Sequence, residues 1–314
     1  MKILVTGGAG FIGRWLVKKL LDGGHHLWVL DNLSGGSLGN ILEFRHERGF
    51  MDFLKGDVCD RKLLSSLFKN GFDICYHLAA SINVQDSIDR PRSTFENDVI
   101  GSFNVLEECR LSNTKIVFMS TCMVYEHASE NERIDESHPL KPASPYAGSK
   151  MSAENMVLSY WHAYKHPAVI LRPFNTYGPY QKTSGEGGVI SIFIRKALSG
   201  KPLCIYGDGE QTRDFLYVED CADFVAKAGF CDEANGKVIN AGTGNDISIN
   251  NLATMICKET GNIIHVPHIH PQSEIKKLLC NFDLAKKLLG WKPTTSLEEG
   301  VENTKKWIIE SERT

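Results

Sequence analysis

The chain of 314 residues lacks any uninterrupted apolar run near the length of about 18 residues that a membrane-spanning helix needs. It also lacks an excess of either charge, because 35 Lys and Arg stand against 38 Asp and Glu, for a net charge of -3. A general nucleic-acid binder usually carries a strongly basic face, which this balance does not favour. We therefore expect neither a membrane nor a nucleic acid among its partners.

Closely spaced cysteine pairs are absent as well. The nine cysteines are scattered and no Cys-x-x-Cys pair occurs, so zinc-ribbon and thioredoxin-like sites have no support. His265, His268 and His270 alternate in one segment without a cysteine nearby, and we predict no metal site. Scattered reduced thiols, together with the lack of a secretory signal pattern after Met1, lead us to expect a cytoplasmic protein.

What the sequence does contain is a regular alternation of short apolar runs and helical patterns. Strands are expected at 2–6, 26–30, 52–55, 73–78, 115–120, 168–171 and 237–240. Helices are expected after residue 13 and at 60–68, 95–110, 149–164, 190–198, 249–259, 282–289 and 297–310. This alternation predicts an α/β fold in which a Rossmann doubly wound parallel sheet is covered by helices on both faces.

A glycine-rich turn follows the first predicted strand directly. Gly7, Gly10 and Gly13 form G-x-x-G-x-x-G between a strand and a helix, the context in which backbone amides and a helix N-terminus bind a pyrophosphate. Asp31 ends the second strand, where a carboxylate accepts hydrogen bonds from ribose hydroxyls and repels a 2′-phosphate. We therefore predict NAD rather than NADP as cofactor. The alternative is a tight turn followed by an unrelated acidic loop.

The composition of the chain changes after residue 173, where prolines, glycines and polar residues indicate a long functional loop. We predict an NAD-binding Rossmann domain over residues 1–173, with a return segment near 214–250. Residues 174–213 and 251–314 are then expected to form a smaller C-terminal α/β lobe. This lobe is expected to bind substrate over the carboxyl edge of the sheet.

Tyr146 and Lys150 have the spacing Y-x-x-x-K, which puts both side chains on one face of a helix. An ammonium group beside a phenol favours the phenolate, so Tyr146 can act as a base near neutral pH. Thr121 follows a buried strand and can present its hydroxyl at the same edge of the sheet. The alternative is that Tyr146 and Lys150 are ordinary residues on the surface of a helix.

These motifs occur together with others in the order typical of one family. The chain resembles the extended short-chain dehydrogenase/reductases of the nucleotide-sugar epimerase/dehydratase kind. The matching segments are TGGAGFIG (6–13), DNLS (31–34), GDV (56–58), HLAA (77–80), Asn97 with Gly101, STCMVY (120–125), SPYAGSK (144–150), RPFNTYGP (172–179), GDGEQTRDFLYVED (207–220) and LGW (289–291). The resemblance implies tightly held NAD and removal of hydride from a sugar carbon, with Tyr146 as base supported by Thr121 and Lys150.

The resemblance also implies which residues bind the cofactor and the substrate. The cofactor residues are Gly7, Gly10, Phe11, Ile12, Gly13, Asp31, Asn32, Asp57, Val58, Leu78, Ala79, Ala80, Tyr146 and Lys150. The substrate residues are Ser81, Asn175, Arg213 and His270, of which Arg213 is expected at the pyrophosphate. His270 stands where many relatives carry an arginine. Arg213 has independent support, since a nucleotide diphosphate needs a fixed cationic donor.

The sequence leaves open which reaction follows oxidation at sugar C4, because Cys122 and Met123 stand where common 4,6-dehydratases carry an Asp-Glu pair. Methionine cannot move a proton, which leaves a UDP-hexose or UDP-N-acetylhexosamine 4-epimerase open. Residues 120–125, 180–193 and 268–279 nevertheless most resemble retaining UDP-GlcNAc 4,6-dehydratases. For such an enzyme Cys122 and Lys182 are our candidates for proton transfer, as an ionised thiol and a desolvated lysine. Alternatively, Cys122 is a small core residue and Lys182 a solvated loop residue.

The sequence also bears on two alternative functions and on the oligomeric state. A non-catalytic NAD-binding regulator on the same fold is possible in principle, but the presence of Thr121, Tyr146 and Lys150 argues against it. Decarboxylation of a glucuronate would want a basic residue at the sugar carboxylate, and we cannot place one. The helices near 95–110 and 149–164 match those through which relatives pair, so we expect a homodimer. Their apolar residues could equally cover only the sheet.

Overall fold

The computed structural model describes all residues except 130–131, 183–187, 258–261, 269–274 and 313–314. Its largest element is a sheet of seven parallel strands with the order β11-β6-β5-β4-β1-β2-β3. The strands are β1 Lys2–Thr6, β2 His26–Asp31, β3 Phe50–Lys55, β4 Ile74–His77, β5 Lys115–Met119, β6 Ala168–Pro173 and β11 Lys237–Ala241. The order reverses between β1 and β4, which opens a crevice at the carboxyl ends of these two strands. The predicted doubly wound α/β fold is confirmed.

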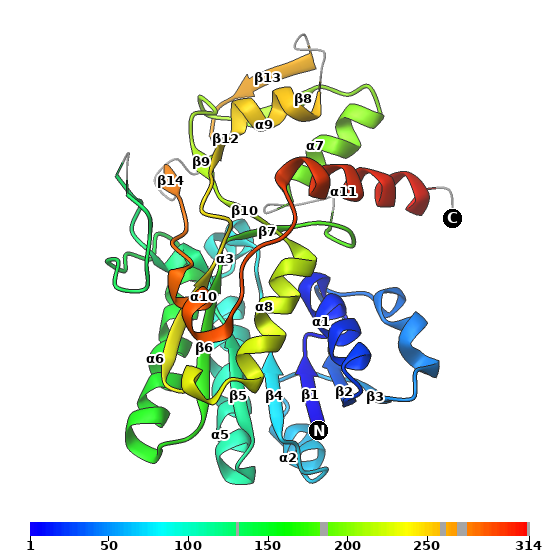
Figure 1. Cartoon of the computed structure of the whole chain (residues 1–314), viewed down its shortest axis with the longest axis vertical. Helices are drawn as coiled ribbons and strands as arrows, with labels where there is room; N and C mark the ends of the chain where they lie inside the picture. The colour runs from blue at the N-terminus through cyan, green and yellow to red at the C-terminus, as the bar shows by residue number, and fades with distance from the viewer. Residues whose placement is uncertain (130–131, 183–187, 258–261, 269–274, 313–314) are drawn as a thin grey trace.

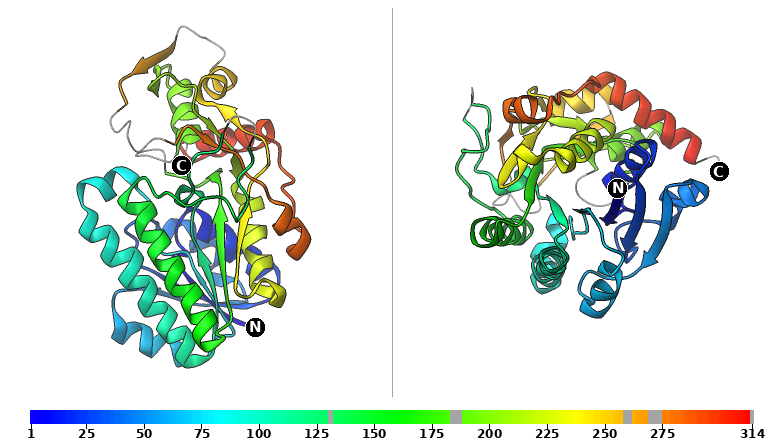
Figure 2. Two further views of the ribbon diagram at one scale, coloured as in Figure 1. Left: turned by 90° about the vertical axis from the view of Figure 1, so that its left-hand side faces the viewer. Right: turned by 60° about the horizontal axis from the view of Figure 1, so that its bottom comes forward.

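Helices cover both faces of this sheet (Figures 1 and 2). One face packs on α1 Phe11–Asp22, α8 Val218–Phe230 and α10 Asp283–Leu289. The other packs on α2 Arg61–Phe68, α5 Ser102–Ser112 and α6 Pro145–Tyr164. The central strands β1, β4, β5 and β6 are largely apolar, as expected of strands that are buried on both faces.

Helix α8 was not among the expected helices. It begins directly after β10 Phe215–Tyr217 and is buried on most of its surface, largely through small side chains such as Cys221, Ala222 and Ala228. Its polar residues Glu219, Asp223 and Lys227 do recur every four residues, so the helical period was present in the sequence and was not recognised. Helix α3 Val84–Asp89 was also missed, since a helix of this length carries less than two turns of pattern.

The single helix expected at 95–110 is wrong in detail. The segment consists of α4 Pro91–Phe95, a π-helical turn η3 Glu96–Gly101, and then α5. The π turn buries Asp98 and Gly101, and a Cβ on Gly101 would lie 2.6 Å from Cγ2 of Val58. Gly101 therefore allows this turn to pack closely against the segment that follows β3. π turns of this kind occur frequently at functional sites.

The helix expected at 149–164 begins earlier, at Pro145. Ser144 caps it by accepting a hydrogen bond from the backbone N–H of Ala147 (3.2 Å), and proline is well suited to the first helical position. The earlier start places Tyr146 in the first turn of α6 and Lys150 one turn later.

A second group of elements lies beyond the carboxyl ends of the strands (Figure 1). Helices α7 Val189–Leu198, α9 Ile249–Ile256 and α11 Leu297–Ser311 share a separate hydrophobic core with the parallel pair β8 Leu203–Tyr206 and β13 Ile263–Val266. Of the helix expected at 249–259, residues 258–259 lie outside the described residues. The domain boundaries given above stay a prediction.

Short strand pairs connect the two groups of elements. β7 Asn175–Tyr177 pairs in parallel with β10, while β9 Thr212–Arg213 lies between β12 Ile247–Ser248 and β14 Lys277–Leu278. These pairs bring the loop after β6 and the Arg213 segment to the carboxyl edge of the sheet.

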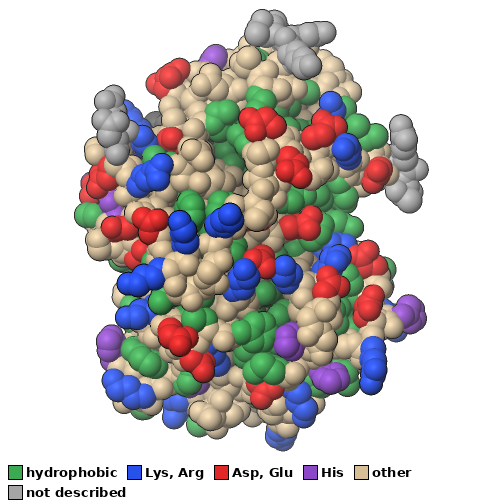
Figure 3. Space-filling view, viewed as in Figure 1, with side chains coloured by type: hydrophobic (Ala, Val, Ile, Leu, Met, Phe, Trp, Pro, Cys, Tyr) green, Lys and Arg blue, Asp and Glu red, His purple; other side chains and the backbone are tan. Residues whose placement is uncertain are grey.

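No helix in the described part of the chain is both long and apolar enough to cross a membrane. On the face shown in Figure 3, Lys and Arg side chains are interspersed with Asp and Glu, in line with the near-neutral net charge of -3.

Candidate active site at the carboxyl edge of the sheet

The glycine turn forms one end of the site. Gly7 adopts a φ of +72°, and its N–H donates to the carbonyl of Leu30 (2.8 Å), which ties the turn to the end of β2. A Cβ on Gly13 would lie 2.1 Å from the carbonyl oxygen of Gly7, so only glycine allows α1 to pack this closely on the turn. Gly10 is the N-cap of α1 and supplies no side-chain cap, so the N–H groups of the first turn remain available for an anion.

The ends of β2 and β3 continue the cleft. Asp31 is buried, and its carboxylate accepts hydrogen bonds from the backbone N–H groups of Ala9 (3.0 Å) and Leu33 (2.7 Å). Burial raises the pKa of Asp31, while these two hydrogen bonds oppose the shift. The side-chain amide of Asn32 donates to Asp57 (2.8 Å), which links two of the predicted cofactor residues. The segment has the carboxylate acceptors that a ribose diol would need.

The segment after β4 closes the cleft from the other side. A Cβ on Gly7 would lie 2.7 Å from the backbone nitrogen of Ala79, so the two segments are in close contact. Leu78, Ala79, Ala80 and Ser81 are half-buried. Apart from Tyr146 and Lys150, the predicted cofactor residues are thus brought together at the carboxyl ends of neighbouring strands, although they lie in four separate segments of the chain.

Thr121, Tyr146 and Lys150 meet at the end of β5. All three side chains are buried, with 8%, 7% and 2% of their surface exposed. A hydrogen bond from Thr121 lowers the pKa of Tyr146, but burial outweighs it and holds that pKa well above the ordinary value. Burial lowers the pKa of Lys150, whose Nζ donates to the carbonyl oxygen of Met119 (2.8 Å). The three predicted residues are thus brought together, but the pKa of Tyr146 is raised, which is opposite to the direction expected from a neighbouring ammonium group.

The expectation that Cys122 ionises is wrong. Its side chain is 2% exposed, and burial raises the pKa of the thiol to about 12, although the charge of Arg213 opposes the shift. Cys122 therefore carries a proton at neutral pH. Met123 is half-buried and packs against the small hydrophobic core that contains Cys122.

The expectation of a desolvated Lys182 is also wrong, because this residue is exposed. Water reaches its side chain, so the structure does not show the desolvated lysine that we looked for. The interpretation of Lys182 as a solvated loop residue is the one that agrees with the structure.

Polar groups for a substrate lie on β7 and β9. Asn175 donates its backbone N–H to the carbonyl of Asp214 (3.1 Å), and its buried side-chain Nδ2 has no hydrogen-bond partner among the described residues. Arg213 is half-buried and close enough to act electrostatically on Cys122. His270 lies outside the described residues. No group of three or more His, Cys, Asp or Glu in the described part of the chain could hold a metal ion.

Comparison with known proteins places this site in a family. A family model described as GDP-mannose 4,6 dehydratase matches residues 4–304, which is nearly the whole chain. The chain belongs to this family. It is therefore an enzyme of the nucleotide-sugar epimerase/dehydratase group of extended short-chain dehydrogenase/reductases, and the resemblance inferred from the sequence is confirmed.

Several solved structures are similar to this chain over the whole fold. The Pal protein of Bacillus thuringiensis is 62% identical, with a TM-score of 0.97 over 99% of this chain and 100% of its own. The UDP-glucose 4-epimerase of Thermus thermophilus, in complex with NAD, is 32% identical (TM-score 0.89; 98% of this chain and 99% of its own). The dTDP-glucose 4,6-dehydratase of Bacillus anthracis, also in complex with NAD, is 29% identical (TM-score 0.89; 100% of this chain and 98% of its own).

Both reactions thus occur on this fold, and both solved enzymes hold NAD. NAD is a cofactor of the family, and the glycine turn with its uncapped helix N-terminus fits a dinucleotide. Membership of the family does not choose between epimerisation and dehydration, because that choice depends on the few residues beside the sugar.

One buried residue of the site was missed by the sequence analysis. Asp98 lies on the π turn, is 0% exposed, and interacts electrostatically with Lys150 and Tyr146. No periodicity marks it, because a π turn shifts the side of the helix that faces inward by one residue.

Proposed function

We propose that this enzyme binds NAD along the glycine turn and oxidises the C4 hydroxyl of a nucleotide-linked sugar. The observation that carries the proposal is the buried Tyr146, held by the Thr121 hydroxyl with Lys150 one helical turn away. Tyr146 takes the hydroxyl proton as the C4 hydride leaves, and the product is a 4-keto sugar. When bound, NAD supplies the hydride acceptor. Lys150 supplies the positive charge that favours the phenolate form of Tyr146.

The substrate that we propose is UDP-GlcNAc or a close relative. Arg213 provides a fixed positive charge at the edge of the site, suited to a diphosphate. The unpaired Nδ2 of Asn175 supplies a buried hydrogen-bond donor beside it, which a sugar nucleotide would satisfy.

For the reaction that follows C4 oxidation, the candidate that we prefer is 4,6-dehydration. A 4-epimerase needs one proton carrier, since the same phenol that took the O4 proton returns it. A 4,6-dehydratase needs a second group that gives a proton to the C6 oxygen, because the C6 hydroxyl leaves as water. Cys122 adjoins Thr121 and holds a proton at neutral pH, so it can donate to the leaving oxygen. The C5 proton is lost to solvent, hydride returns to C6, and C5 and the thiol are reprotonated from solvent. The product is a 4-keto-6-deoxy sugar nucleotide.

A 4-epimerase is the second candidate, and the residue that favours it is Met123. Its thioether cannot take the C5 proton, and Lys182 is exposed. In an epimerase the ketone would turn within the site, and hydride would return to the opposite face of C4.

Proton NMR of the purified enzyme with UDP-GlcNAc in deuterated water, with no added cofactor, tests the proposal. We expect a new methyl signal, a hydrated 4-ketone and deuterium at C5. A galacto-configured product without a methyl group would replace the dehydratase with the epimerase. No turnover of UDP-GlcNAc or of any other nucleotide sugar in a panel would overturn the proposed function altogether.

The choice of cofactor depends on the charge of Asp31. We expect Asp31→Asn to raise the affinity for NADP relative to NAD at least about tenfold, because the repulsion of a 2′-phosphate is removed. The amide oxygen can still accept from one of the two backbone N–H groups, of Ala9 or of Leu33, but not from both, because these groups bind different oxygens of the Asp31 carboxylate. Titration of the stripped protein with both cofactors measures this ratio. An unchanged ratio would show that Asp31 does not face the ribose.

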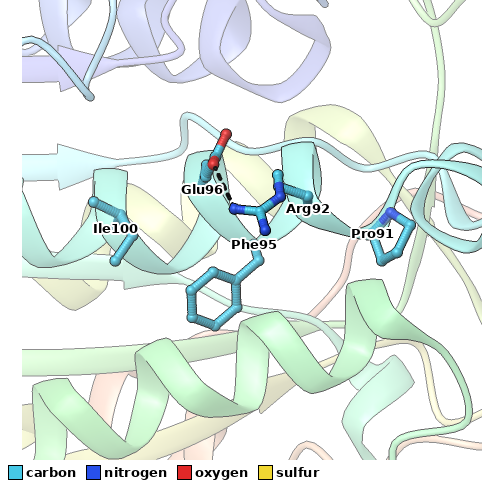
Figure 4. A pocket seen from close by; sticks show the side chains of 5 residues that line it. All are labelled: Pro91, Arg92, Phe95, Glu96 and Ile100. Atoms are coloured by element: carbon cyan, nitrogen blue, oxygen red, sulfur yellow. Dashed lines mark ion pairs between the residues drawn. The ribbon is translucent and has the colours of Figure 1, made fainter.

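We further propose that the enzyme is a homodimer that pairs through the segment 91–112 and α6. Phe95, Ile100 and Phe103 are exposed on this segment, by 49%, 43% and 37%. Figure 2 (left) shows the segment lying beside α6 on the outside of the sheet. Figure 4 shows the hollow lined by Pro91, Arg92, Phe95, Glu96 and Ile100. Exposed apolar side chains along the segment 91–112 fit a second copy of the same face.

Phe95→Asp is expected to halve the molar mass measured by light scattering, because it puts a charge at the centre of the apolar contact. Leu198→Asp is the matched control, since Leu198 is 41% exposed on α7 and lies outside this face. A monomeric parent protein, or a Phe95→Asp variant that stays dimeric, would contradict the proposed interface.

A further inference from the structure

Asp98 is a buried carboxylate beside the proposed catalytic residues. Its Oδ1 accepts hydrogen bonds from the backbone N–H of Ser81 (2.6 Å) and from the side-chain amide of Asn97 (2.8 Å). Its Oδ2 is buried and has no hydrogen-bond partner among the described residues. A buried carboxylate with an unsatisfied oxygen is costly, so a compensating charge nearby is expected.

Lys150 lies on α6, which packs against the π turn that carries Asp98, and its charge opposes the rise in the pKa of Asp98 that burial causes. The hydrogen bond of Lys150 to Met119 is made with an uncharged carbonyl group. Among the described residues, two carboxylates act electrostatically to keep Lys150 protonated, those of Asp98 and Glu154. Glu154 is already neutralised, because Arg172 binds it through two hydrogen bonds of 2.8 and 2.5 Å. Asp98 remains as the carboxylate whose charge Lys150 balances.

We propose that Asp98 is a positioning residue of the active site, the buried counter-ion of Lys150 that also anchors the Ser81 segment of the cofactor cleft. The proposal rests on the proposed role of Tyr146 and Lys150. In this proposal the π turn directs the Asp98 carboxylate into the interior, whereas a regular helix would point the same residue in another direction.

The other titratable groups around Asp98 are neutral near pH 7 or already paired. His77 on β4 faces Lys150, and its burial lowers its pKa to about 3. The thiol of Cys59, after β3, has its pKa raised to about 11, in part by Asp98. The thiol of Cys122, which faces Tyr146, is protonated, as described above. Asp98 therefore has one unbalanced cation to act on among the described residues, and that cation is Lys150.

The charge of Asp98 acts in one direction on both catalytic groups. It raises the pKa of Tyr146 and supports the protonated form of Lys150. The rate of C4 oxidation rises with pH as Tyr146 loses its proton and falls as Lys150 loses its own. Removing the charge of Asp98 lowers both pKa values, so both limbs of the pH–rate profile move to lower pH.

Asp98→Asn tests this inference, because the amide oxygen can still accept from Ser81 while the charge is lost. The rate of NADH formation in a single turnover, measured across pH with the NAD-loaded enzyme, is expected to peak on the order of one pH unit lower than in the parent. Asp220→Asn is the control, since Asp220 is a buried carboxylate that binds Thr294 and Thr295 away from this site. We expect this control to keep the parental profile.

A purely structural role for Asp98 would reduce the rate equally at every pH, and that result would overturn the inference. An equal shift in Asp220→Asn would overturn it as well. NMR of [13Cζ]tyrosine-labelled, NAD-loaded protein gives a second readout, with the Tyr146 signal assigned through Tyr146→Phe. We expect that signal to titrate at lower pH in Asp98→Asn. This readout needs no substrate, so it still tests Asp98 if no nucleotide sugar is turned over and the proposed function fails.

Discussion

Tyr146→Phe is expected to lower the rate of C4 oxidation by about 10²–10⁴-fold, the range typical of a lost general base. The phenyl ring keeps the packing of a residue that is 7% exposed, so the loss should come from the hydroxyl alone. Formation of bound NADH in a single turnover measures this step directly. The step is common to the dehydratase and the epimerase, so the result does not depend on which of them is correct.

Tyr164→Phe is the matched control for this experiment. Tyr164 ends the same helix and is 59% exposed, and its ring contacts Tyr160 outside the site. We expect the control to keep the parental rate and both variants to keep the parental content of NAD. A Tyr146→Phe variant as fast as the parent would remove Tyr146 from the mechanism and with it the central argument for the proposed function.

Arg172→Met is expected to lower the free energy of unfolding by about 3–5 kcal/mol, the usual effect of leaving one member of a buried ion pair alone. Arg172 and Glu154 are 3% and 2% exposed, and the guanidinium binds both carboxylate oxygens. Without Arg172, the Glu154 carboxylate would remain in the interior with no cation bound to it. Urea unfolding followed by circular dichroism measures the change.

Two further variants test the interpretation of this ion pair. Replacing both members, as Arg172→Met with Glu154→Leu, should restore most of the lost stability, because no charge is then left buried. Lys141→Met breaks the ion pair with Glu126, in which the lysine is 68% exposed, and should cost less than about 1 kcal/mol. An Arg172→Met variant as stable as the parent would show that water reaches Glu154.

The residues of the cofactor cleft could be predicted because each lies next to a local signal. Gly7, Gly10 and Gly13 stand between an apolar strand and a helix, and the close packing of Gly13 depends on Gly7 and Gly8, which are near it in sequence. Asp31 ends a strand, and the carboxyl ends of parallel strands meet at one edge of the sheet. The spacing of Tyr146 and Lys150 required only that their segment be helical.

The protonation states of the site could not be predicted in this way. Cys122 and Lys182 were both expected to have altered charge, but the first is buried and protonated and the second is exposed. Whether a side chain is desolvated depends on elements distant in sequence. Cys122, for example, packs in one small core with Leu278 and Cys280.

By itself the sequence determined the doubly wound α/β fold in outline, the position of the dinucleotide turn, and the family. The first two follow from apolar periodicity and glycine spacing, which act over a few residues, and the family follows from the resemblance of its motifs. Only the tertiary structure decided that Asp98 faces Lys150, that Arg172 neutralises Glu154 and that Cys122 keeps its proton. The energy of a charge depends on the solvent and the counter-charges around it, and these are assembled from distant segments when the chain folds.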